Sequence, residues 1–137
     1  MSWDVLLMRF PNDAVSVAGL PDDYEVSPIG PVSEVLGRIR SAFPGADLSD
    51  PAWGLLRDER SGWSMELNMG TKDPVESIML HIRGGGDVVS TALSLAHLLD
   101  CRAVDCSDGE FLSDEGGGES WEEFQAYRDQ VIGRPLE

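Results

Sequence analysis

The sequence predicts a single α+β domain in which helices pack on one face of a mainly antiparallel sheet. The chain has 137 residues, the usual length of one domain, and 42% of them are hydrophobic, which is enough for a core. Three segments separated by short turns have the apolar pattern of strands. Other segments have apolar residues at the spacing of one helical face. The expected order over residues 1–137 is β-α-β-β-β-α-β-α.

The first strand is predicted at residues 3–10, where a nearly continuous apolar run ends at Phe10-Pro11. Such a run is typical of a strand that is covered on both faces in the interior of a sheet. A long connection over residues 11–30 follows. A helix is then expected between Gly30-Pro31 and Pro44-Gly45, because proline suits the first turn and the apolar residues between them share one helical face.

Three further strands are predicted as an antiparallel meander. The segments 53–59 and 63–69 flank Arg60-Ser61-Gly62, which is typical of a hairpin, and a third segment covers residues 75–83. The alternation assigns one face of the sheet to the core and the other to solvent. The residues expected on the core face are Trp63, Met65, Leu67, Met69, Ile78, Leu80 and Ile82.

The remaining elements follow a glycine turn. Gly84-Gly85-Gly86 is expected to need positive φ, with Asp87 capping a mostly buried helix over residues 88–99. A short strand at residues 101–106 and an irregular acidic loop at 110–119 come next. A capping box from Ser120 to Glu123 then predicts a C-terminal helix over residues 120–133, with one apolar face formed by Phe124, Tyr127, Val131 and Ile132.

The amino-terminal segment and the cysteines predict a cytoplasmic protein. No basic segment precedes the first apolar run, and no stretch approaches the ~20 apolar residues that cross a bilayer. Cys101 and Cys106 are expected to point to opposite faces of one strand, so a disulfide between them is unfavourable and two free thiols suit a reducing compartment. Neither a metal site nor a cofactor is expected, since no ligand set accompanies these cysteines.

Acidic residues dominate the charge of the chain. The formal net charge is −15 and the pI is about 4.2, which argues against nucleic acid and anionic membranes as direct partners. Residues 100–137 carry −8 of this charge. Between residues 105 and 123 there is no Lys or Arg, and eight acids occur: Asp105, Asp108, Glu110, Asp114, Glu115, Glu119, Glu122 and Glu123.

Two interpretations of this acidic stretch stay open. It can be a solvated surface that aids solubility, or it can be a recognition surface that binds a basic protein and accelerates association. On the second interpretation these eight acids together with Trp121 form the partner-binding set. Phe111, Leu112 and Tyr127 supply further candidate apolar anchors, because charge alone provides little affinity.

The solvent face of the predicted sheet is the alternative site. Glu66, His81 and Arg83 are expected on this face, where a carboxylate beside an imidazole could perform acid–base chemistry or bind a small ligand, with the turn Gly84–Gly86 nearby. That turn lacks the lysine of a phosphate-binding loop, and Asp87 would repel an anion there. A second copy of the chain covering the face, to form a homodimer, is a third hypothesis.

The chain also resembles a known class of small proteins. It is short, strongly acidic and α+β in pattern, with tryptophan-containing segments at Asp50-Pro51-Ala52-Trp53-Gly54 and Ser120-Trp121-Glu122-Glu123-Phe124 and without a recognisable catalytic set. In these respects it is similar to bacterial immunity-type proteins that neutralise toxins, and to uncharacterised families of that kind. The resemblance implies a non-enzymatic inhibitor with a basic protein partner such as a toxin. It covers length and overall character, so it assigns no role to any single residue.

Overall fold

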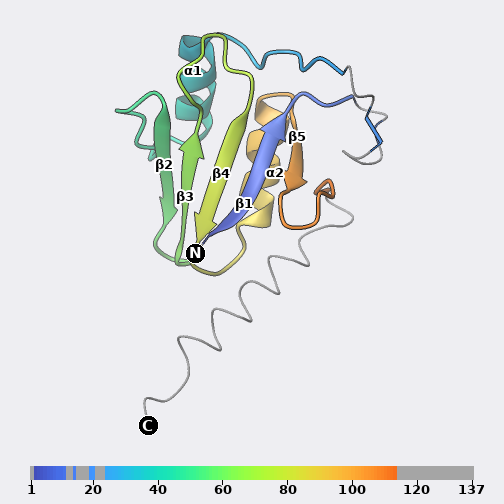
Figure 1. Cartoon of the computed structure of the whole chain (residues 1–137). Helices are drawn as coiled ribbons and strands as arrows, with labels where there is room; N and C mark the ends of the chain where they lie inside the picture. The colour runs from blue at the N-terminus through green and yellow to red at the C-terminus, as the bar shows by residue number, and fades with distance from the viewer. Residues whose placement is uncertain (1, 12–13, 15–18, 21–23, 114–137) are drawn as a thin grey trace.

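A computed structural model describes residues 2–11, 14, 19–20 and 24–113 of the chain. These residues form five strands and two helices (Figure 1). In chain order the elements are β1 (Trp3–Met8), α1 (Val32–Ala42), β2 (Trp53–Asp58), β3 (Trp63–Asn68), β4 (Ile78–Arg83), α2 (Val89–Leu98) and β5 (Arg102–Asp105). The α+β class is therefore confirmed. The third predicted helix, at 120–133, and most of the predicted loop 110–119 lie outside the described residues.

The sheet has the strand order β2-β3-β4-β1-β5, and all its neighbouring strands are antiparallel. The predicted meander of β2, β3 and β4 is confirmed. The first strand inserts between β4 and β5, so it lies inside the sheet as predicted. It is not covered on both faces, however, because its residues alternate between buried and half-buried from Trp3 to Met8.

Both helices lie on one side of the sheet (Figure 1). The hydrophobic core lies between the helices and this side of the sheet. Alternate residues of β1, β3 and β4 point to this side, including the fully buried Val5, Met65 and Leu80. Val35 and Ile39 of α1 and Leu95 of α2 complete the layer. Burying each such side chain stabilises the fold by roughly 1.5–3 kcal/mol. The core face predicted for β3 and β4 is confirmed at Trp63, Met65, Leu67, Ile78, Leu80 and Ile82.

Short segments pair with both outer strands of the sheet. Asp47 and Leu55 of β2 exchange two backbone hydrogen bonds of 2.9 Å. Beside β5, Phe111 forms a bridge with Val104, and the Leu112 amide donates to the Ala103 carbonyl at 2.9 Å. These contacts occupy edge groups that could otherwise pair with another chain, which makes strand addition less favourable at either edge.

The glycine turn between β4 and α2 has the backbone that the sequence predicts at two of its three positions. Gly84 has φ +97° and Gly86 has φ +86°. A Cβ on Gly84 would overlap the Gly62 carbonyl oxygen and lie 2.7 Å from the Trp63 Cα. The predicted cap is shifted: Val88 is the N-cap of α2, and Asp87, one residue earlier, accepts a hydrogen bond from the Ser90 hydroxyl at 3.2 Å.

We predict that Gly84→Ala destabilises the protein by about 2 kcal/mol or more, because it combines a positive φ with a clash against backbone that has little room to move. The free energy of unfolding from urea denaturation checks this. The matched control is Gly37→Ala within α1, where a new Cβ meets nothing within 4 Å and helix propensity improves by roughly 1 kcal/mol. Equal effects of the two substitutions would contradict the tight packing at Gly84.

Candidate functional site

The sheet face turned away from α1 and α2 carries the polar residues that the sequence singles out. We call this side of β2, β3, β4 and β1 the open face. The strand register places Glu66 of β3 directly opposite His81 of β4, and His81 directly opposite Asp4 of β1. Arg83 lies opposite Ser64 in the next row. Glu66, His81 and Arg83 therefore do share one face, as predicted.

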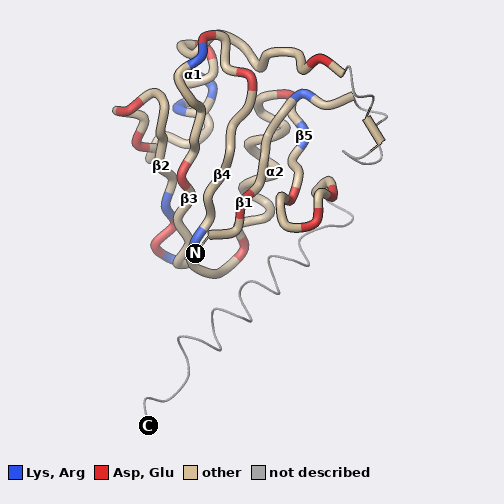
Figure 2. The backbone as a smooth tube through the Cα atoms, in the orientation of Figure 1, with Lys and Arg blue, Asp and Glu red and all other residues tan. Residues whose placement is uncertain are grey.

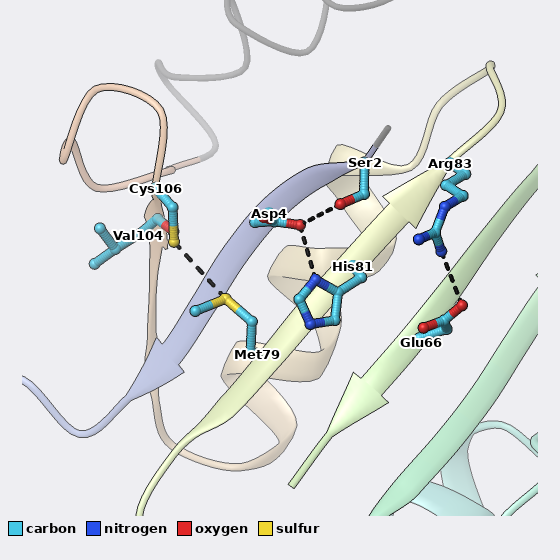
Figure 3. Close-up of polar contacts among 8 residues, drawn as sticks. All are labelled: Ser2, Asp4, Glu66, Met79, His81, Arg83, Val104 and Cys106. Atoms are coloured by element: carbon cyan, nitrogen blue, oxygen red, sulfur yellow. Dashed lines mark hydrogen bonds and ion pairs between the residues drawn. The ribbon is translucent and has the colours of Figure 1, made fainter.

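The ion pairs on the open face differ from the expected ones (Figure 3). Arg83 Nη1 donates to Glu66 Oε1 at 2.8 Å, so Glu66 pairs with arginine rather than with the imidazole. His81 Nδ1 lies 2.9 Å from Asp4 Oδ1, and the Ser2 hydroxyl donates to the same carboxylate oxygen at 2.6 Å. The carboxylate beside His81 is thus Asp4, which sequence reasoning missed because the pairing of β1 with β4 joins residues 77 positions apart.

Trp53 completes this group from the far side of β3. Its ring stacks on the His81 ring with a centroid separation of 5.6 Å and an angle of 18° between the planes. It is 42% exposed, and no other large hydrophobic side chain of the described residues is classed as exposed. Half-buried Leu6, Leu55 and Met79 extend the apolar part of the same face. An exposed aromatic ring with apolar neighbours is a common anchor in protein interfaces.

Hollows of substrate size lie away from the polar groups. One of about 370 Å³ opens at the end of the open face, between Leu6, Met79 and the loop around Lys72. A second of about 380 Å³ lies between α2 and β5, and a third of about 410 Å³ lies beside Asp47. Glu66, His81 and Arg83 line none of these three. Their acid and base groups lie on the sheet surface instead of converging on a substrate.

A small aromatic cluster lies beside β5, at one edge of the sheet. The rings of Phe10 and Phe111 meet edge to face at 5.4 Å, and the Arg102 guanidinium lies 3.6 Å from the centroid of Phe111. Leu112, next along the chain, is buried in the helix-side core. Phe111 and Leu112 are therefore used inside the fold, which corrects their prediction as free anchors for a partner.

The described part of the predicted partner-binding set divides into buried and exposed acids. Asp105 is 1% exposed, and its carboxylate accepts hydrogen bonds from the backbone amide and hydroxyl of Ser107. It holds the turn after β5, so its prediction as a partner contact is wrong. Asp108 and Glu110 are exposed in the same turn, as predicted. The other members lie outside the described residues: Asp114, Glu115, Glu119, Trp121, Glu122 and Glu123.

Most basic side chains of the described residues are occupied by contacts within the chain. Arg38, Lys72 and Arg83 form ion pairs with Glu34, Glu76 and Glu66. Arg9 donates to the Pro28 and Leu99 carbonyls, and Arg102 donates to those of Pro11 and Ala14. Figure 2 shows acidic positions spread over the loops, including the turn after β5. The acidic surplus is therefore left largely uncompensated at the surface.

Both cysteines are free thiols, and they lie on opposite sides of the sheet as predicted, with Cys101 in the helix-side core and Cys106 beside Met79. Cys101 is buried, and this burial raises its pKa to about 11. Cys106 is exposed just after β5, with its Sγ 3.8 Å from Met79 Sδ. Desolvation raises the Cys106 pKa, and the neighbouring Asp4 and Asp105 raise it further. Among the described residues, no three His, Cys, Asp or Glu side chains gather in a group that could hold a metal ion.

No protein-family model, curated protein or solved structure matches this chain. Within the described ranges, no helix has the length and apolar character needed to span a membrane.

We predict that neutral His81 carries its proton on Nδ1, because a carboxylate such as Asp4 can only accept a hydrogen bond. Nitrogen-15 NMR of the imidazole distinguishes the two tautomers. His97, which is exposed on α2, is the internal control and should show mainly the Nε2-protonated form. Mainly Nε2-protonated His81 would contradict the Asp4–His81 geometry.

We predict that a thiol reagent labels Cys106 but not Cys101 in the folded protein. Because thiolate is the reactive form and the Cys106 pKa is raised, its labelling rate should still rise with pH above ~8.5, where the rate of an ordinary thiol begins to level off. Mass spectrometry of the labelled peptides measures both sites, and Cys106→Ser should abolish native labelling. A rate that levels off below that pH, or labelling of Cys101 before unfolding, would contradict these environments.

Proposed function

We propose that this chain is a non-enzymatic protein-binding module that uses an acidic surface to bind a basic protein partner. The supporting observation is that, in the described residues, most basic side chains are engaged within the chain while many acidic side chains are exposed. Five basic side chains are held by ion pairs or by backbone carbonyls: Arg9, Arg38, Lys72, Arg83 and Arg102. Exposed acids such as Asp108 and Glu110 are not neutralised in this way. A cationic partner would meet an attractive field on approach.

The acidic stretch favours one region of this surface. The turn after β5 presents Asp108 and Glu110, and the sequence that follows adds five more acids up to Glu123 without a Lys or Arg. Charges of one sign gathered in one region increase the rate of association and select against acidic competitors. Asp105 is excluded from the proposed contact set because it is buried. The proposed set is Asp108, Glu110, Asp114, Glu115, Glu119, Trp121, Glu122 and Glu123.

The proposed class is that of an inhibitor of immunity type. Such a protein needs a stable scaffold and a complementary surface, and it needs no substrate pocket. The flat placement of Glu66, His81 and Arg83 on the open face favours binding over catalysis. In this proposal the protein acts in the cytoplasm, where the two free thiols Cys101 and Cys106 would stay reduced.

The alternative is a small-ligand binder or enzyme that uses Glu66, His81 and Arg83 with the Gly84–Gly86 turn. One observation favours it: Asp4 orients His81 through Nδ1, as a carboxylate does in many acid–base sites, and Trp53 supplies a stacking surface. A ligand screen by NMR tests it. Ligand-induced shifts confined to Trp53, His81 and their neighbours would support this alternative over the first proposal.

We predict that Glu119, Glu122 and Glu123 changed together to Lys slow association with a basic partner by about tenfold or more at low salt, because steering depends on local charge. Affinity capture from extracts of the source cells, with tagged full-length chain, identifies basic proteins that bind the wild type. Association rates with the purified partner are then measured at low and high salt.

The matched control makes the same change in net charge elsewhere, with Glu25, Glu59 and Glu76 replaced by Lys; all three are exposed. The control should retain most of the wild-type association rate. Equal slowing by both triple variants would show an effect of bulk charge and would remove residues 119–123 from the binding surface. Failure of the wild type to capture any basic protein would overturn the proposed function.

A further inference from the structure

We infer that Cys106 and Met79 form a binding site for a soft monovalent metal ion of the copper(I) class, with their two sulfur atoms as ligands. The site lies where the end of β5 meets β1 and β4, and it uses a thiol and a thioether that have no part in the proposed function. The inference is independent of that function, because it needs neither the acidic surface nor a protein partner.

Three strands bring the two sulfur atoms together. Met79 lies on β4 and Cys106 directly follows β5, while β1 pairs with both strands and lies between them. The Cys106 backbone amide donates to the Asp4 carbonyl of β1 at 3.0 Å, which fixes the residue at the end of this pairing. Figure 3 shows the two side chains reaching toward each other over β1, with Cys106 Sγ and Met79 Sδ 3.8 Å apart. Sequence reasoning could not find this pair, because its members are 27 positions apart.

The separation of the sulfur atoms suits two ligands of one ion. With metal–sulfur bonds of about 2.3 Å, as in zinc thiolate sites, a separation of 3.8 Å corresponds to a sulfur–metal–sulfur angle of about 110°. This angle is typical of an ion with three or four ligands, so at least one further position of the ion stays open. Because Cys106 is exposed, an ion held by this pair is accessible from solvent.

The types of donor select the class of metal. Thiolate and thioether sulfur are soft ligands that favour copper(I), whereas magnesium, calcium and manganese favour oxygen ligands. A structural zinc site needs four ligands. In the part of the chain that the structure describes, no three His, Cys, Asp or Glu side chains gather to supply them. The pair therefore suits a soft ion of low charge that needs few ligands from the protein.

The electrostatic surroundings of Cys106 favour a bound cation. Desolvation raises the Cys106 pKa, and Asp4 and Asp105 raise it further, so the thiol keeps its proton at neutral pH when no metal is bound. A metal ion replaces that proton: the S–H bond breaks, a metal–sulfur bond forms, and the proton passes to the buffer with no change in oxidation state. The two carboxylates that favour the proton also attract the metal ion.

Silver(I) tests the site, because it is a soft monovalent ion that needs no reductant. It is titrated into the reduced full-length chain in nitrate buffer without chloride. We expect the methyl NMR signal of Met79 to shift as silver binds, while that of Met8, half-buried on the same side of β1 as Asp4, stays in place. Bound silver should also block labelling of Cys106 by a thiol reagent. Zinc at the same concentration should have neither effect.

Variants assign the two ligands. Cys106→Ser should abolish silver binding at this site, and Met79→Leu should weaken it by about tenfold or more, because one of two soft ligands is lost. Met8→Leu makes the same change next to Arg102 instead of Cys106, so it is the matched control and should keep the wild-type affinity. Cys101→Ser removes the buried thiol and should keep it as well. Amide NMR spectra show in each variant that the sheet is folded.

Three results would overturn the inference. The first is a wild-type chain whose Met79 methyl signal does not move at a silver concentration that saturates Cys106. The second is equal silver affinity of folded Met79→Leu and Met8→Leu, which would leave Cys106 as a solitary thiol. The third is zinc binding as tight as silver binding. Partner capture by the acidic surface is a separate measurement, so failure of this site is distinguishable from failure of the proposed function.

Discussion

The alternation of side chains along β1, β3 and β4 is the constraint on which the rest of the structure depends. Successive residues of a strand point to opposite faces, so these strands build one face that is almost wholly apolar and another that is mixed. Val5, Met65 and Leu80 are fully buried under the helices, whereas Asp4, Glu66 and His81 lie on the open face. A shift of register by one residue would exchange the two faces and bury charge.

The two faces of the sheet therefore serve different purposes. The helix-side face supplies stability, so the open face and the loops are free to carry recognition. On the open face, the ionisable groups are paired in twos, Asp4 with His81 and Glu66 with Arg83, and the exposed Trp53 stacks on His81. Around the sheet, the basic side chains are largely engaged within the chain. The exposed acids that remain support the proposal of a cationic protein partner.

Sequence reasoning succeeded where the signal was local. The meander, both described helices and the core residues of β3 and β4 follow from periodicity and short turns. It failed where contacts join distant residues: the place of β1 beside β4, the Asp4–His81 pair and the Trp53 stack all depend on a register that one sequence does not specify. The role of Asp105 was also misjudged, although here the signal was local. The segment Asp105-Cys106-Ser107 has the side-chain-to-backbone pattern of a turn, and this signal outweighs its membership of an acidic run.

Exposed acids give this chain its proposed role as a binding module for a basic protein partner. The salt dependence of the association rate with that partner tests this role most directly, because salt screens the attraction between exposed charges. The expected result is a fall of about tenfold or more in the association rate between low and physiological salt. An association rate that salt leaves unchanged would contradict an electrostatic role for the acidic surface.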